Sequence, residues 1–232
     1  MSGLSDQKIQ SDLYQSLDFS KILENEYAID LSLTTSTLQQ IFSMEYDLVF
    51  HFAAQGLVSK AKENPRGTIN SNIIGTYNIL EAINLYCKTP CLIVATTDKV
   101  YANPLALNTE DFPIGGDEFY SATKAASEHI IRAFTKTIKR SDLNIGIIRS
   151  GNVLGGGDGA ADRVITDILN SLKNNAKIKL RNPSGVRPWQ YIIDSLHGYL
   201  LSAEYCVQNR VDEIFNLHSK KNNNFTVREI TE

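Results

Sequence analysis

Tyr120 and Lys124 are the residues whose types and spacing best suit proton chemistry in this chain. Four residues apart, they share one face of a helix. A lysine ammonium beside a phenol stabilises the phenolate and so lowers the tyrosine pKa. The tyrosine then becomes a usable base for taking a proton from a hydroxyl group while hydride leaves the attached carbon. Taken alone, the pair also fits a solvated lysine beside a half-buried tyrosine.

Three further reactive groups stand about twenty residues earlier, where Thr97, Asp98 and Lys99 follow an apolar run. They supply a hydroxyl, a carboxyl and an amine. The plainer interpretation is a strand-end turn capped by the aspartate side chain. A hydroxyl after one strand, followed by Tyr-x-x-x-Lys opening the next helix, favours a catalytic site over that interpretation.

The elements that must position these groups alternate along the chain. Short apolar runs predict buried strands, and amphipathic stretches predict helices, one of which carries Ile73, Tyr77, Leu80 and Ile83 at helical spacing. This alternation predicts an α/β fold, a Rossmann-like doubly wound parallel sheet with helices on both faces. The strands are expected at 47–54, 91–97, 144–150 and 213–218, and the helices at 69–86, 120–137, near 161–174 and at 192–206.

In such sheets ligands bind beyond the carboxyl ends of the strands. The polar residues after the first and third predicted strands, Gln55 and Asn152, are therefore candidate binding residues beside the Thr97 segment. Arg181 and Arg187 flank a proline-containing turn, and a guanidinium fork matches phosphate oxygens. The pair is thus a candidate diphosphate site, although a surface loop with two solvated arginines fits the same residues.

Composition excludes several classes of function. A net charge of -3 indicates no nucleic-acid or membrane surface. No apolar run reaches the length of a membrane helix, and the first residues do not resemble a signal peptide. The three cysteines and four histidines lack metal-ligand spacing, so no metal site is predicted. Three cysteines in apolar or helical contexts suit reduced thiols and a cytoplasmic location.

Five motifs in order along the chain resemble the CDP-glucose 4,6-dehydratases, NAD-dependent members of the extended short-chain dehydrogenases. The match runs from about Leu13 to the end, and its last two motifs are long and uncommon. Related dTDP-glucose dehydratases carry Thr-Asp-Glu where this chain has Lys99, so the lysine favours the CDP-glucose branch. The motifs are HFAAQ at 51–55, TDKVYAN at 97–103, YSATK at 120–124, RSGNVLGGGD at 149–158 and RNPSGVRPWQ at 181–190.

The resemblance implies conversion of CDP-glucose to CDP-4-keto-6-deoxyglucose through transient oxidation at C4 by bound NAD. It implies a homodimer and a role in dideoxysugar synthesis for surface polysaccharide. Asp98 would protonate the departing C6 hydroxyl, and Lys99 is the candidate C5 base, for which its pKa must fall well below ~10.4. The implied catalytic residues are Thr97, Asp98, Lys99, Tyr120 and Lys124; those for the cofactor are Asp30, Ala53, Ala54, Gln55, Tyr120 and Lys124; those for the substrate are Asn152, Arg181, Arg187 and Gln190.

No G-x-G-x-x-G or G-x-x-G-x-x-G occurs in the 232 residues. The resemblance therefore implies that residues 1–150 form a partial NAD-binding domain without its first strand and glycine-rich turn. Residues 151–232 would combine substrate-binding segments with returning elements of the same sheet, with part of the substrate region absent after Glu232. Two alternatives stay open: a nucleotide-sugar epimerase of the same superfamily, and an inactive truncated remnant.

Overall fold

The computed structural model describes residues 29–33, 35–103, 108–160, 162–218 and 224–232, and residues 23, 25 and 27 individually. Helices and strands alternate along most of this length. In chain order they are α2 (Thr35–Phe42), β1 (Val49–His51), α3 (Val58–Glu63), α4 (Pro65–Ile69), the π-helical turn η2 (Asn70–Ile74), α5 (Gly75–Tyr86), β2 (Cys91–Thr97), the 3-10 turn η3 (Asp98–Val100), α6 (Phe119–Thr137), β3 (Asn144–Ser150), β4 (Asn152–Leu154), α7 (Val164–Lys173), β5 (Val186–Tyr191), α8 (Ile192–Asn209), β6 (Glu213–Leu217), β7 (Asn224–Thr226) and α9 (Val227–Thr231).

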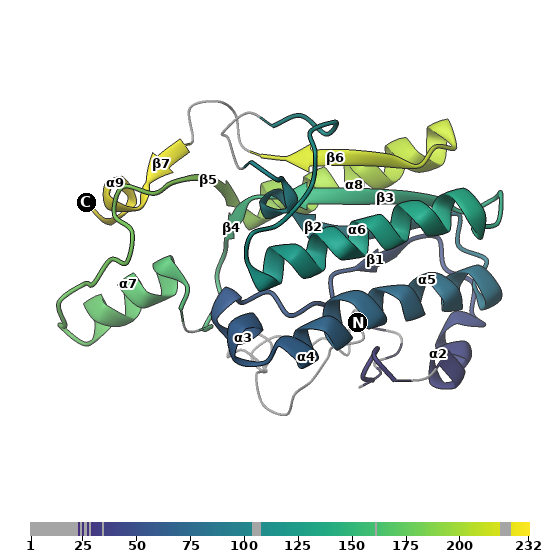
Figure 1. Ribbon diagram of the computed structural model, residues 1–232, viewed down its shortest axis with the longest axis horizontal. Coiled ribbons are helices and arrows are strands. Elements are labelled where there is room, and N and C mark those ends of the chain that lie inside the picture. Colours follow the sequence, from purple (N-terminus) through teal and green to yellow (C-terminus); the bar gives the residue numbers. More distant parts are fainter. Residues whose placement is uncertain are drawn as a thin grey trace.

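The main sheet has four strands in the order β1-β2-β3-β6, and every pair is parallel. Its central strands β2 and β3 are buried along almost their whole length, which explains their continuous apolar sequences. Helices α5 and α6 cover one face and α8 covers the other (Figure 1). The predicted α/β architecture with a parallel sheet is confirmed, and β2 and β3 have the predicted bounds.

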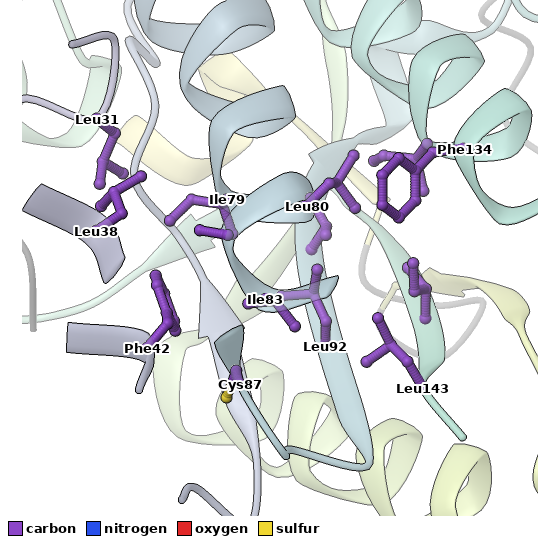
Figure 2. Packing of buried hydrophobic residues seen from close by; sticks show 14 of the residues in the cluster. Leu31, Leu38, Phe42, Ile79, Leu80, Ile83, Cys87, Leu92, Phe134 and Leu143 are labelled. Atoms are coloured by element: carbon purple, nitrogen blue, oxygen red, sulfur yellow. The ribbon is translucent and has the colours of Figure 1, made fainter. Parts of the chain in front are cut away.

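The larger hydrophobic core lies between the sheet and the helices α2, α5 and α6. Figure 2 shows Leu38 and Phe42 of α2 on the side of α5 that carries Ile79 and Ile83. A smaller core lies under α8, where Tyr199, Ala203 and Cys206 pack on the opposite face of the sheet. Burial on both faces fixes the sheet and thereby the ends of its strands, where the reactive groups lie.

The helix predicted at 69–86 is interrupted. Residues 70–74 form a π-helical turn between α4 and α5. Such a turn contains an additional residue and rotates the following face relative to the preceding one. The predicted apolar stripe is therefore only half right: Leu80 and Ile83 are buried, whereas Ile73 is half-buried and Tyr77 is exposed. Asn72 and Thr76 take the buried positions instead.

A second sheet, in the order β4-β5-β7, stands apart from the first. Figure 1 shows it with α7 beyond the end of the main sheet at which α6 begins. The strand β4 pairs in parallel with β5, which pairs antiparallel with β7. These short strands have no apolar run that predicts them. Within the described part of the chain, no helix combines the length and apolarity needed to cross a membrane.

Candidate functional site

Tyr120 occupies the first turn of α6, and the start of that helix is fixed by Glu118. The Glu118 carboxylate accepts hydrogen bonds from the backbone N–H groups of Tyr120 and Ser121, each at 2.8 Å. The Ser121 hydroxyl lies 3.3 Å from the Glu118 backbone N–H, which completes a capping box. These bonds satisfy N–H groups that have no partner within the helix. The cap therefore sets where Tyr120 stands relative to the sheet.

Lys124 lies one turn further along α6 and points into the protein. Its side chain is buried, and its Nζ donates a hydrogen bond to the Ala95 carbonyl oxygen at 2.7 Å. Burial lowers the pKa of Lys124 to about 8, and the Glu128 carboxylate partly opposes that shift. The ammonium has two further N–H donors, which suit a phenol or a ribose hydroxyl.

The pKa of Tyr120 differs from the sequence-based expectation of a lowered value. Burial raises it, because desolvation penalises the phenolate. The nearby Thr97 hydroxyl and the charge of Arg163 act in the opposite direction but do not overcome burial. The predicted lowering was wrong for this arrangement, in which the Lys124 ammonium donates a hydrogen bond to the Ala95 carbonyl oxygen.

Thr97 stands at the end of β2 and binds the acidic residue that follows it. β2 ends at Thr97, whose hydroxyl donates to Asp98 Oδ1 at 3.1 Å and accepts from the Lys99 backbone N–H at 3.3 Å. Asp98 is half-buried, and its pKa is raised by that burial, although Thr97, Lys99 and Arg187 act to lower it. The Lys99 Nζ lies 5.8 Å from the centre of the Tyr120 ring, over its face. The structure thus brings the five predicted catalytic residues to one end of β2.

The predicted cofactor residues lie at the end of β1 and before α2. Ala53, Ala54 and Gln55 follow β1 and are half-buried. Asp30 is exposed, and its carboxylate accepts from the backbone N–H and the hydroxyl of Ser32, both at 2.8 Å. Ala53, Ala54 and Gln55 thus follow the edge strand of the sheet, which pairs with β2, the strand that ends at Thr97.

Asn72 is a residue of the site that the sequence interpretation missed. Its Oδ1 accepts from the Gln55 backbone N–H at 2.7 Å, and its Nδ2 donates to the Gln55 carbonyl at 3.1 Å and to the Thr123 hydroxyl at 3.0 Å. It thereby ties the end of β1 to α6. The Asn72 carbonyl accepts from Ser127 at 2.7 Å. A polar, poor helix former inside an amphipathic pattern was the signal available in the sequence.

Arg163 was also missed. Its charge acts on the Tyr120 phenol, and its side chain forms an ion pair with Asp158 at 3.2 Å. Its Nη2 would lie 3.9 Å from a Cβ placed on Gly56, at the carboxyl end of β1. No local pattern in the sequence distinguishes this arginine from a surface charge.

The predicted substrate residues have different surroundings. Arg187 lies close enough to Asp98 for its charge to lower that pKa, whereas Arg181 forms ion pairs with Asp162 and Asp167 at 3.3 and 3.5 Å. The Gln190 amide is buried, donates to the Leu217 carbonyl at 2.6 Å and accepts from the Ser195 hydroxyl at 3.2 Å.

Asn152 begins β4 and is half-buried. The structure thus brings Arg187 close to the catalytic residue Asp98. The Gln190 side chain is instead taken up by hydrogen bonds within the fold. Among the described residues, no cluster of three or more histidine, cysteine, aspartate or glutamate side chains could hold a metal ion.

His51 is a buried neutral histidine at the end of β1. Its Nε2 lies 3.1 Å from the Thr76 hydroxyl, which itself donates to the Asn72 carbonyl at 2.7 Å. The hydroxyl must therefore accept from His51, which fixes the proton on Nε2. Burial first, and the charge of Lys124 second, lower the pKa of His51 to about 3.

We expect His51 to make the protein less stable in acid. Its pKa is about 3 when folded and 6.5 in the reference state, so below pH 6.5 only the unfolded chain takes up the proton. The stability lost should be about 2 kcal/mol between pH 6.5 and 5, at ~1.4 kcal/mol per pH unit. His51→Gln keeps a donor near Thr76 but cannot titrate. In urea unfolding its free energy of unfolding should therefore fall by about 2 kcal/mol less than that of the parent between pH 6.5 and 5. The exposed control His129→Gln should behave like the parent, and equal slopes for all three proteins would contradict this role.

The comparisons with known proteins identify the family and agree with the fold. Residues 10–217 match the family described as the NAD dependent epimerase/dehydratase family. A CDP-glucose 4,6-dehydratase of Salmonella typhimurium is 36% identical over 166 residues, which cover 68% of this chain and 46% of that protein. A dTDP-glucose 4,6-dehydratase of Mycobacterium tuberculosis is 35% identical over 109 residues, 45% of this chain and 32% of that protein. The chain belongs to the NAD-dependent epimerase/dehydratase family.

Solved structures show the same fold. The dTDP-glucose 4,6-dehydratase from Streptomyces venezuelae, solved as a double mutant with NAD bound, has a TM-score of 0.77 at 22% identity, covering 89% of this chain and 61% of that one. The UDP-glucuronic acid 4-epimerase from Bacillus cereus, in complex with UDP-glucuronic acid and NAD, has a TM-score of 0.79 at 21% identity, covering 91% and 65%. The chain spans less than half the length of the two curated relatives named above.

Proposed function

We propose that this chain carries the catalytic residues of a nucleotide-sugar 4,6-dehydratase that acts on CDP-glucose. The observation that carries the proposal is the arrangement at the end of β2, where the Thr97 hydroxyl donates to Asp98 Oδ1 at 3.1 Å and the Lys99 Nζ lies 5.8 Å from the centre of the Tyr120 ring. A base for a sugar hydroxyl and a carboxylic acid for a departing hydroxyl therefore stand side by side. Sequence similarity to a CDP-glucose 4,6-dehydratase supports the same reaction.

NAD is the cofactor that the site suits. When bound, it would supply reversible hydride acceptance from C4 and return to C6 of the sugar. The donor set fits a ribose, since the buried Lys124 ammonium donates one hydrogen bond to the Ala95 carbonyl and has two further N–H donors. Ala53, Ala54 and Gln55 line the neighbouring end of β1, and Asp30 is a candidate for the adenine end.

Tyr120 would hold the proton taken from the C4 hydroxyl. The Thr97 hydroxyl and the charge of Arg163 favour the phenolate, and burial opposes it. A cation that approaches the phenol closely would shift this balance towards the phenolate, which is the role we assign to Lys124. Oxidation at C4 then acidifies the C5 proton, because the resulting ketone stabilises the carbanion.

Asp98 is proposed as the acid that protonates the C6 hydroxyl as it leaves. Its raised pKa keeps the proton on the carboxyl group at higher pH than an exposed aspartate would. Lys99 remains the candidate C5 base, a role that requires its neutral amine form; its Nζ lies over the Tyr120 ring, 5.8 Å from the ring centre. It replaces the glutamate that the resemblance places at this position in the dTDP-glucose branch.

The nucleotide diphosphate is expected near Arg187. This guanidinium lies beside Asp98, on the strand that pairs with β4, which begins at Asn152. Arg181 would have to exchange its ion pairs with Asp162 and Asp167 to take part. A cytoplasmic location, a homodimer and a role in polysaccharide synthesis belong to the same proposal, and the three buried free cysteines agree with a reducing compartment.

Incubation of the purified chain with CDP-glucose and NAD, followed by mass spectrometry of the sugar nucleotide, tests the reaction. Loss of one water from the sugar is the expected result. Asp98→Asn should reduce that loss by about 10²-fold or more, because an amide cannot donate the acid proton. Asp111→Asn, at an exposed aspartate, is the matched control and should react like the parent.

The same experiment separates the alternative reactions. An epimerase needs Tyr120 and Lys124 but no acid for water loss, so it would change the sugar's configuration at constant mass and tolerate Asp98→Asn. No change of any kind, with a full-length relative as positive control, would show that this chain alone is inactive and would contradict the proposal.

A further inference from the structure

Glu128 and Arg149 form an ion pair from which solvent is excluded, with both side chains 0% exposed. Arg149 Nη2 lies 2.6 Å from Glu128 Oε2, and its Nε lies 3.1 Å from both carboxylate oxygens. The Thr96 hydroxyl donates to Glu128 Oε1 at 2.7 Å. A charge pair is retained in a protein interior only when it is satisfied as completely as this one.

The guanidinium reaches from this pair to the turn that carries two catalytic residues. Its Nη1 donates to the Tyr101 hydroxyl at 2.9 Å, and the group stacks on the Tyr101 ring with 4.8 Å to the centroid. Tyr101 closes the turn of Asp98 and Lys99, and its backbone N–H lies 3.4 Å from the Asp98 carbonyl. The Tyr101 hydroxyl donates onward to Asn216 Oδ1 of β6 at 2.6 Å.

Glu128 lies on α6, the helix that also carries Tyr120 and Lys124. Glu128 follows Lys124 by one turn of α6 and Tyr120 by two, so the three side chains share one face. One buried pair therefore connects the helix of the base to the turn of the acid. Misplacement of reacting groups by about 1 Å can slow catalysis about 10²-fold, so a rigid connection of this kind affects the reaction rate.

We propose that the Glu128–Arg149 pair is a positioning device that fixes the turn of Asp98 and Lys99 against the helix of Tyr120 and Lys124, an inference that rests on the dehydratase function proposed above. Stability alone does not require these ions, because apolar residues of similar volume commonly replace a buried pair at no loss. What apolar side chains cannot supply is the pair of directional contacts by which Arg149 of β3 binds Glu128 of α6 and the Tyr101 hydroxyl.

The test is the double variant Glu128→Met with Arg149→Met, which fills the volume without charge. Its melting temperature should stay close to that of the parent. Amide hydrogen exchange in residues 98–103 should become about tenfold faster or more, while residues 144–148 of β3 stay protected. In the parent, opening of the turn must break the contacts between Arg149 and Tyr101; in the variant those contacts are gone, so the turn opens more easily. Where the parent is active, kcat should fall by about tenfold or more with KM unchanged, as expected for misaligned groups.

One control and one substitute variant make the outcome decisive. Replacing the exposed pair Lys88–Glu45 by methionines should change neither exchange nor kcat. If the double variant does not fold, Tyr101→Phe takes its place, because it removes the hydroxyl that binds Arg149 and Asn216 while the ring and the ion pair stay; its turn should also exchange faster. Parent-like exchange at residues 98–103 in the folded variant would overturn the proposal. An inactive parent would count against the dehydratase function, and the exchange result would still decide the positioning role.

Discussion

Replacing Arg149 alone by methionine should lower the free energy of unfolding by about 3–5 kcal/mol, because it leaves a buried carboxylate without its counter-ion. Glu128 is 0% exposed, so solvent cannot take the place of the guanidinium. Chemical unfolding in urea at pH 7, read by circular dichroism, measures the change. The loss should shrink as pH falls, because the isolated carboxylate then takes up a proton and no longer carries a buried charge.

Two comparisons define what would contradict this expectation. Arg66→Met, at an exposed arginine, should alter the free energy of unfolding by less than about 0.5 kcal/mol. The double methionine variant should recover most of the loss, because it leaves no unpaired charge. A single variant as stable as the parent would show that water reaches Glu128 in solution and that the pair is not the closed unit described above.

Lys124→Met should have opposite effects on activity and on stability. Where the parent dehydrates its substrate, the rate should fall by about 10²- to 10⁴-fold, the range that positioned acid–base groups contribute. Stability at pH 7 should rise by about 1–2 kcal/mol. The lowered lysine pKa of about 8, against 10.5 in the reference state, corresponds to about 3 kcal/mol, and the lost hydrogen bond to Ala95 offsets part of it.

The sign of the pH dependence follows from the same shift. The folded state binds the Lys124 proton more weakly than the unfolded chain, so the penalty is complete below pH 8 and disappears towards pH 10.5. The stability advantage of Lys124→Met should therefore shrink across that range in urea titrations at pH 7 and pH 10. Lys136→Met, exposed on the same helix, is the control and should show no such change. A variant less stable than the parent at pH 7 would contradict a desolvated ammonium.

The parallel sheet was predictable because burial on both faces leaves a direct mark on composition. β2 and β3 are continuous apolar runs, and their bounds agree with the prediction. The placement of Thr97 near Tyr120 was predictable for a related reason, since a strand end and the start of the next crossover helix meet at the same edge of a parallel sheet. Both features follow from local pattern and chain connectivity.

The contacts that decide the chemistry are of another kind. Asn72 meets Thr123 across 51 residues, and Glu128 meets Arg149 across 21 through two adjacent elements. Residue types allow such contacts, but only the packed sheet selects the partners. The π-helical turn at 70–74, which brings Asn72 inward, is stabilised by these partners and has no local signal of its own.

Charge state also depended on the tertiary structure. The sequence determined the parallel sheet and the order of its reactive side chains, including Tyr120 and Lys124 four residues apart. It did not determine that burial raises the pKa of Tyr120 and lowers those of Lys124 and His51. Desolvation depends on every atom packed around a group, most of them distant along the chain, and those neighbours are assigned only when the helices close on the sheet.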